Sequence, residues 1–204
     1  MLVTEITELS KTKARLYIDY QPAFALYKSE LKKYGIKSGE ELSENLYKTL
    51  VSEILTKRAT LRALNLLKSR DYTEHQLINK LKQSEYPPEA IDSAAAYVKS
   101  YGYLDDARYS KAYISYAGAS KSRRQIMNDL LNKGVSKENI DEAFEACIEE
   151  NSLSDEEDLI KKLLQKKHYD GAETTQQDKQ KIIGFLYRKG FSLDKIYRAV
   201  GQSY

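Results

Sequence analysis

Residues 58 to 200 repeat one pattern of apolar side chains three times. Ile91, Ile140 and Ile196 anchor the copies and are separated by 49 and then 56 residues. A leucine stands ten residues before each anchor and an alanine three residues after it; these are Leu81, Leu130 and Leu186, then Ala94, Ala143 and Ala199. A period of this length predicts tandem copies of one supersecondary unit, because neighbouring copies complete the burial of each apolar face.

Helix start signals recur at matching places in the copies. Thr73 with Gln76 and Ser122 with Gln125 have the spacing of a capping box, and Asp178 occupies the equivalent position in the third copy. Five residues before each anchor stands a large apolar residue that can form a hydrophobic staple; these are Tyr86, Val135 and Phe191. The signals predict that each copy contains a second and a third helix with defined starts.

The turn between these two helices also has a recurring pattern. Gly134 and Gly190 stand at the C′ position of the second helix, where the first copy has Glu85, and Ser136 and Ser192 cap the third helix. Each copy therefore reads as three helices, at residues 58–69, 74–83 and 88–101, then 105–117, 122–133 and 137–150, then 155–167, 178–188 and 193–200.

Residues 1–57 show a different pattern, with apolar residues at every second position. Val3–Leu9 and Ala14–Tyr20 alternate in this way, and Gln21-Pro22 interrupts the chain before a third apolar segment, Ala23–Tyr27. We expect a three-stranded meander that is too small to be stable without its neighbours.

Two helices are expected after this meander. Ser29 can cap a short helix that ends at Tyr34 before Gly35, and a second helix should run from about Ser43 to Leu55 or beyond. The expected fold class is mainly α, with tandem three-helix repeats in an elongated or curved array behind a small N-terminal β-meander and helix module. The expected boundaries are 1–57 for the module, 58–103 for repeat 1, 104–151 for repeat 2 and 152–204 for repeat 3.

A short motif joins repeats 1 and 2, and its residues are Gly102, Tyr103, Leu104, Asp105 and Asp106. Gly102 can adopt the left-handed conformation that ends a helix, and Asp105 can cap the next one. A cap is a better interpretation than a metal or acid–base site, because neighbouring carboxylates at a helix start point in different directions. We expect this motif to act as a hinge that sets the angle between the two repeats.

Composition indicates a soluble and mostly helical protein. Of the 204 residues, 31% are charged and 41% are hydrophobic. Cys147 is the only cysteine, so the chain cannot form an internal disulfide, which suits a reducing compartment. There is no leader-like N-terminus and no apolar run of about 18 residues. We therefore expect a cytoplasmic, monomeric protein that contacts no membrane.

The patterns that usually mark an enzyme are missing. The glycines are scattered and form no phosphate-binding loop. His75 and His168 lack cysteines or clustered carboxylates at ligand spacing, and Cys147 lies on an acidic helix that would raise the pKa of a thiol. We predict no catalytic residues, no metal site and no cofactor.

Charge is divided into blocks along the chain. Residues 107–134 contain six basic residues and one acidic residue, 138–158 contain ten acidic and no basic residues, and 159–204 contain ten basic and four acidic residues. Single lysines usually only solvate a helix, but several grouped cations can bind a polyanion through its phosphates. The candidates are Lys121, Arg123, Arg124, Lys133, Lys161, Lys162, Lys166, Lys167, Lys179, Lys181, Arg188 and Lys189.

The first of these candidates share one helix start. Lys121, Arg123 and Arg124 lie where the backbone N–H groups of a helix N-terminus and cationic side chains can together face a phosphate. The sequence therefore predicts an anion site at this position.

Several segments resemble the RecX recombination regulators. They are Ala63–Leu67, Arg70–Thr73, Leu77–Leu81, Gly102–Asp106 with Arg108 and Tyr109, and Asn132–Ser136. Their combination in this order is specific and covers about residues 58 to 200, and the N-terminal meander resembles an extension of some members. The chain departs from the family at Ser122-Arg123, where Gly-Pro is frequent, and at Gln76, where Glu is common.

The resemblance implies tandem three-helix repeats, no catalytic activity, and binding to the RecA recombinase filament, usually with inhibition. It also implies a position along the filament groove and some affinity for single- or double-stranded DNA. The residues themselves leave two alternatives. One is a helix-turn-helix regulator that reads duplex DNA, although the third helix of repeat 2 is strongly acidic for that role. The other is a helical adaptor that binds only proteins.

Overall fold

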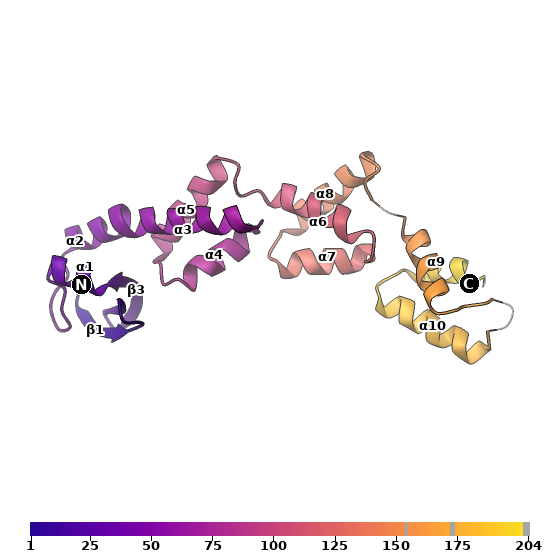
Figure 1. Cartoon of the computed structure of the whole chain (residues 1–204), viewed down its shortest axis with the longest axis horizontal. Coiled ribbons are helices and arrows are strands. Elements are labelled where there is room, and N and C mark those ends of the chain that lie inside the picture. The colour runs from indigo at the N-terminus through magenta and orange to yellow at the C-terminus, as the bar shows by residue number, and fades with distance from the viewer. Residues whose placement is uncertain (154, 172–173, 202–204) are drawn as a thin grey trace. The chain divides into compact units, whose positions relative to one another are not determined.

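The chain folds into helices with one small sheet, as a computed structural model shows for residues 1–153, 155–171 and 174–201 (Figure 1). It divides into two compact units, residues 1–105 and 106–204. The first unit contains the sheet and repeat 1, and the second contains repeats 2 and 3. The expected class, mainly α with three-helix repeats behind a small β-meander, is confirmed.

The sheet contains β1 (Val3–Glu8), β2 (Lys13–Ile18) and β3 (Gln21–Tyr27), which pair antiparallel in the order β1-β2-β3. Pro22 was expected to break the chain before the third strand, but it lies inside β3. An edge strand tolerates proline because one side of it needs no N–H donor.

The tight turn falls one step earlier than the sequence suggested. Asp19 and Tyr20 connect β2 to β3, with φ angles of 48° and 65°. Two consecutive residues in the left-handed region are typical of the two-residue hairpin turn whose twist matches that of the flanking strands.

Helix α1 (Lys28–Tyr34) follows the sheet directly and begins earlier than predicted. Tyr27 rather than Ser29 precedes its first turn, and the Tyr27 N–H donates to the Glu30 carboxylate at 2.8 Å. Glu30 therefore satisfies a backbone donor at the helix start, as an acidic residue in the first turn often does.

One continuous helical run connects the N-terminal module to repeat 1. It consists of α2 (Glu44–Thr49), the π-helical turn η1 (Leu50–Leu55) and α3 (Thr56–Ser69). The boundary expected after residue 57 falls inside this run, so it does not separate two bodies. A π-helical turn widens the helix locally, and Leu50, Val51 and Leu55 from this turn are all buried.

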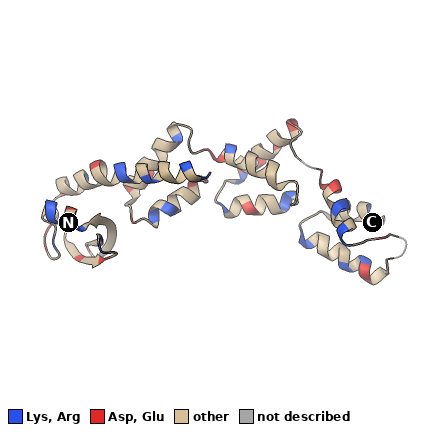
Figure 2. Cartoon of the chain, viewed as in Figure 1, with Lys and Arg blue, Asp and Glu red and all other residues tan. Residues whose placement is uncertain are grey.

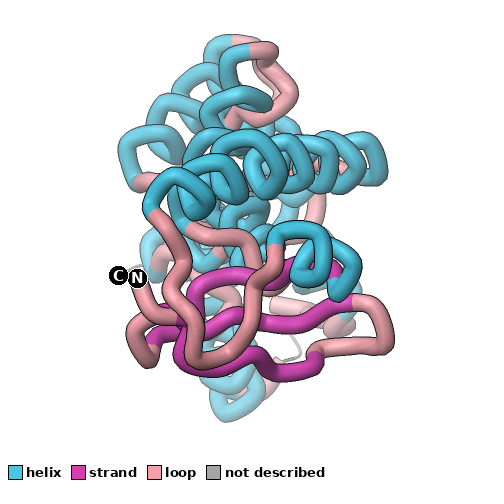
Figure 3. Tube along the Cα trace, turned by 90° about the vertical axis from the view of Figure 1, so that its left-hand side faces the viewer, coloured by secondary structure: helices cyan, strands magenta, loops and turns pink. Residues whose placement is uncertain are grey.

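Repeat 1 continues with α4 (Glu74–Lys82) and α5 (Pro88–Ser100). Its apolar residues share one core with the sheet: Leu16, Phe24 and Leu26 belong to the same buried cluster as Leu77 and Ile91. Figure 3, in which this unit faces the viewer, shows the strands as one layer with helices above them. The meander thus gains stability from repeat 1, as its small size requires.

Repeats 2 and 3 each have their own core. Repeat 2 consists of α6 (Asp106–Ala117), α7 (Arg123–Asn132) and α8 (Lys137–Glu149), and Ile140 and Phe144 are fully buried among them. Repeat 3 consists of α9 (Glu156–Lys166), α10 (Gln176–Arg188) and α11 (Leu193–Val200), around Ile160 and Ile196.

The start of α10 corrects one prediction. Asp178 was expected at the N-cap, but Thr175 occupies that position and accepts a hydrogen bond from the Asp178 N–H at 3.2 Å. Asp178 therefore lies inside the first turn, where its carboxylate accepts a hydrogen bond from the Thr175 hydroxyl at 2.8 Å. The longer connection in repeat 3 changed the local register and moved the cap by three residues.

Candidate nucleic-acid interface

The motif between repeats 1 and 2 lies at the boundary of the two compact units. Gly102 has a φ of 71°, and its N–H donates to the Lys99 carbonyl at 3.0 Å, which closes α5 as predicted. Leu104 is buried in the first core, and Asp105 is the last residue of the first unit. Asp106 begins α6. The proposed role as a hinge therefore falls on the boundary itself and stays a prediction.

Lys121, the first cationic candidate, is neutralised inside repeat 2. Its ammonium group donates to the Asp129 carboxylate at 2.6 Å and to the Tyr113 hydroxyl at 3.1 Å. The hydrogen bond from Lys121 lowers the pKa of Asp129, and the same bond raises the pKa of Lys121. Lys121 is thus a structural cation that ties α7 to the preceding loop and to α6.

The start of α7 holds a carboxylate of the chain itself. The Arg123 N–H donates to Glu156 at 2.7 Å, and the other oxygen of Glu156 accepts from Lys195 at 2.7 Å. Glu156 therefore occupies the end of the helix where a phosphate was predicted. The physical reason for the prediction holds, since a helix N-terminus attracts an anion, but the anion comes from repeat 3.

Ser122 makes a second link between repeats 2 and 3. Its Oγ accepts from the Gln125 N–H at 3.3 Å and donates to the Lys189 carbonyl at 2.6 Å, and the residue is fully buried. The next residue after Lys189 is Gly190, with a φ of 86°. A Cβ at Gly190 would lie 2.8 Å from the Ser122 Oγ, so only glycine allows this approach.

Two lysines line a groove beside this junction. Lys162 and Lys166 extend from α9 into a cavity of about 430 Å³, whose other walls include Ala119 and Ser120 from the loop before α7. Both lysines are exposed, and neither has a carboxylate partner in the part of the chain that the structure describes. Their charges are therefore available to an external anion.

The remaining candidates divide into two groups. Three have partners on their own repeat: Lys161 with Asp158, Lys181 with Asp178, and Lys179 with the Gly171 carbonyl. Others lie over aromatic rings, namely Arg123 over Phe144, Lys133 over Tyr113, and both Lys167 and Lys189 over Phe185. A cation over a ring keeps its full charge, so this second group can still attract an anion.

The most available cations gather where repeats 2 and 3 meet. Arg124 and Arg188 are exposed, and we find no carboxylate partner for them within the described residues. The Arg124 side chain also packs near Gly190. We call Arg124, Lys162 and Lys166 with the adjacent Arg188 and Lys189 the junction cations. Figure 2 shows the basic side chains distributed along the helices of this unit.

Other kinds of site are not apparent. Within residues 1–153, 155–171 and 174–201, no three His, Cys, Asp or Glu side chains converge as a metal ion would require. None of the described helices has the length and apolar composition needed to cross a bilayer. Cys147 is buried in the core of repeat 2, as the sequence predicted.

A chain of three-helix repeats with a group of available cations between two of them belongs to the class of helical repeat proteins that bind other macromolecules. Family models place it more closely. The models for the first, second and third three-helix domains of RecX match residues 59–97, 105–143 and 155–200. These matches cover more than half of the chain, which therefore belongs to the RecX family.

Relatives and solved structures agree with this assignment. The chain is 32% identical to "Regulatory protein RecX" of Caldanaerobacter subterraneus subsp. tengcongensis, over 98% of both chains. It is 30% identical to the protein of the same name from Clostridium beijerinckii, over 95% of this chain and 91% of that one. A crystal structure titled as regulatory protein RecX has the same fold, with a TM-score of 0.64, 24% identity and 98% coverage of both chains. RecX from Lactobacillus salivarius matches 72% of this chain and 95% of its own, with a TM-score of 0.60 and 20% identity.

Proposed function

We propose that this chain binds RecA recombinase filaments and the DNA within them, and that it inhibits their recombination and ATPase activities. Membership in a family whose members are named regulatory protein RecX supports the regulatory role. The junction cations supply the observation from the chain itself: grouped positive charge without carboxylate partners among the described residues.

Electrostatics explain why the junction cations suit a nucleoprotein filament. Each cation that contacts a phosphate releases condensed counterions from the nucleic acid, so several contacts together give substantial and salt-dependent affinity. Contacts of this kind carry no base sequence, which fits a regulator that must bind filaments on any DNA. Lys121 is not part of this set, because Asp129 already balances its charge.

A helix-turn-helix regulator would use its surface differently. In repeat 2 the recognition helix would be α8, and that helix contains Glu138, Asp141, Glu142, Glu145 and Glu149. A helix with so many carboxylates is repelled by the phosphates that border the major groove. We therefore favour binding to filaments over sequence-specific reading of duplex DNA.

A RecA ATPase assay on single-stranded DNA tests the proposal. We expect the protein to reduce the steady-state rate when it is present at a small fraction of the RecA concentration, because each bound molecule affects a multi-subunit filament. A matched assay with a DNA-dependent ATPase that forms no RecA filament serves as the control and should be unaffected. Unchanged RecA activity at equimolar protein would overturn the proposed function.

A further inference from the structure

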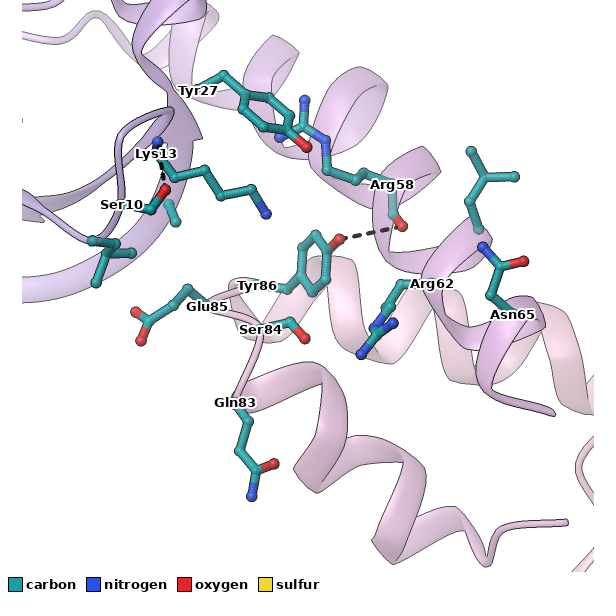
Figure 4. Close-up of a pocket in the computed structure, with 13 residues that line it drawn as sticks. Ser10, Lys13, Tyr27, Arg58, Arg62, Asn65, Gln83, Ser84, Glu85 and Tyr86 are labelled. Carbon is teal, nitrogen blue, oxygen red and sulfur yellow. Dashed lines mark hydrogen bonds between the residues drawn. The ribbon is translucent and has the colours of Figure 1, made fainter. Parts of the chain in front are cut away.

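The largest cavity in the first unit lies where the N-terminal module meets repeat 1. It measures about 610 Å³, and its walls come from the β1–β2 turn and β3, from α3, and from the turn between α4 and α5 (Figure 4). These three segments are far apart in the sequence, so the cavity exists only because the module packs on repeat 1. We call it the module groove. None of the cationic candidates of the second unit lines it.

Most of the charges around the module groove are balanced within the chain. Arg15 forms a bidentate ion pair with Glu85, with distances of 2.6 and 2.8 Å, and the Glu85 carboxylate points away from the cavity (Figure 4). Arg58 pairs with Glu30 at 2.5 Å and lies over the Tyr27 ring. These pairs fix the walls and leave no net charge from their own residues.

Two further cations of the groove are not balanced. Lys13 and Arg62 line the cavity, and within the described chain neither one has a carboxylate partner. Figure 4 shows their side chains approaching from two sides of Tyr86, whose hydroxyl is bound to the Arg58 carbonyl at 3.4 Å. Two unpaired cations on opposite walls define a place where carboxylates or phosphates gain attraction from both sides.

Exposed leucines flank these cations. Leu9, in the β1–β2 turn, has 41% of its surface exposed, and Leu61 on α3 has 62% exposed. Both line the module groove. Asn65, one turn beyond Leu61, adds an exposed amide that can bond to a peptide group. The groove therefore combines an unbalanced positive charge with apolar edges and a donor and acceptor for backbone.

The aromatic rings of the groove argue against nucleic acid as the ligand. Single-stranded DNA is usually held by exposed aromatic rings on which bases stack. Here Lys13 and Arg58 already lie over the Tyr27 ring, at 5.0 and 4.6 Å from its centre. The exposed tyrosines of this unit are Tyr20, Tyr97, Tyr101 and Tyr103, and none of them lines the groove.

We infer that the module groove binds an acidic peptide segment of a partner protein. Carboxylates of the segment pair with Lys13 and Arg62, and an apolar side chain of the segment covers Leu9 or Leu61. The partner is thus a protein with an acidic, partly apolar stretch in an accessible loop or terminus. This site is separate from the junction cations and does not depend on the proposed function.

Fluorescence anisotropy with a labelled peptide of alternating Asp, Glu and Leu residues tests this inference. The full chain should bind it, and a peptide with Asn and Gln in place of the acids should bind far more weakly. In the double variant Lys13→Glu with Arg62→Glu, binding should fall about tenfold or more, because two attractions become repulsions. The matched control, Lys68→Glu with Lys82→Glu, reverses two exposed lysines of the same unit outside the groove and should bind as the parent does.

Three results would overturn the inference. They are equal peptide affinity of the groove variant and the parent, equal binding of the neutral peptide, and displacement of the acidic peptide by oligothymidylate from the parent but not from the groove variant. Circular dichroism of both variants shows whether they are folded, and if the double variant unfolds, Arg62→Gln alone gives the same comparison with a smaller loss. Inhibition of RecA in the ATPase assay is a separate readout, so either proposal can fail while the other stands.

Discussion

Gly190 has the most constrained backbone position that we find among the described residues of the second unit. Its φ of 86° disfavours any side chain, and a Cβ would lie 2.8 Å from the Ser122 Oγ and 3.2 Å from the Arg124 Cβ. Left-handed conformation alone costs a non-glycine residue about 1 kcal/mol, and an overpacked contact adds about as much again or more. Single atoms here determine how closely repeats 2 and 3 approach.

Gly190→Ala should therefore lower the free energy of unfolding by about 3 kcal/mol. Gly201→Ala is the matched control, because Gly201 has a φ of 69° and no atom within 4 Å of its Cβ position. That variant should lose only about 1 kcal/mol. Denaturant unfolding of both variants measures the difference, and equal losses would show that the contact with Ser122 is unimportant.

Asp129 gives the second unit an acid-sensitive contact. Its pKa in the folded protein is lowered, mainly by the hydrogen bond from Lys121, so the carboxylate stabilises the fold above its unfolded pKa of about 3.9. This stability is lost as the pH falls through the lower, folded pKa. Because both side chains are more than about a third exposed, the contribution should be below about 1 kcal/mol.

Asp129→Asn should accordingly destabilise the protein slightly at pH 7 and not at all near pH 2. Urea unfolding across this range measures the difference between the two proteins. A difference that stays constant down to the lowest pH would contradict the assigned cause.

At the scale of elements, the start of α7 does more than begin a helix. Ser122 caps it, Arg123 receives Glu156 at its backbone, and both contacts involve repeat 3 or its flanks. A cap normally satisfies donors within one helix. Here the same residues also fasten one repeat to the next, so the loss of the cap should affect both.

Ser122→Ala should cost about 2 to 3 kcal/mol, because it removes the cap and leaves the buried Lys189 carbonyl without its donor. The comparison is Ser136→Ala in α8, where the hydroxyl caps through the Asn139 N–H at 3.2 Å. That substitution should cost about 1 kcal/mol. Amide hydrogen exchange in α10 would also rise in the first variant only; the same small cost and the same exchange in both would refute the inter-repeat role.

The helices themselves were predictable, and their partners were not. Ile91, Ile140 and Ile196 have the same spacing from their caps in each copy, and all are buried because periodicity reports which face of a helix is apolar. Glu156 looked like one more residue of an acidic block, since nothing local indicates that a carboxylate meets a backbone 33 residues away. The same reason hid Lys13 and Arg62, which the sequence places in separate elements.

At the scale of the whole molecule, the boundary between the two units is sharper than the boundaries between repeats. The first unit includes the sheet, repeat 1 and Leu104, all within one core. The sequence suggested a separate module before residue 58, because the apolar period changes there from two to 3.6. A change of period marks a change of secondary structure, but it does not divide a shared core.

A fragment of residues 1–105 should fold alone, and a fragment of residues 58–105 should not. The shorter fragment lacks Leu16, Phe24 and Leu26, which are at most 1% exposed in the intact unit. Their loss exposes the apolar surface of repeat 1 that they cover. Dispersed amide resonances of the longer fragment and collapsed resonances of the shorter one would agree with this account, whereas a folded shorter fragment would contradict it.

The central claim is that the junction cations hold the chain on RecA–DNA filaments. Charge reversal tests it most directly, through the fluorescence-detected affinity of the variant Arg124→Glu, Lys162→Glu and Lys166→Glu for assembled filaments. The control reverses Lys48, Lys57 and Lys68, three exposed lysines of the first unit, and has the same net charge. We predict that the junction variant binds at least about tenfold more weakly and with a smaller salt dependence, while the control binds as the parent does. Equal binding by the junction variant and the parent would contradict the claim.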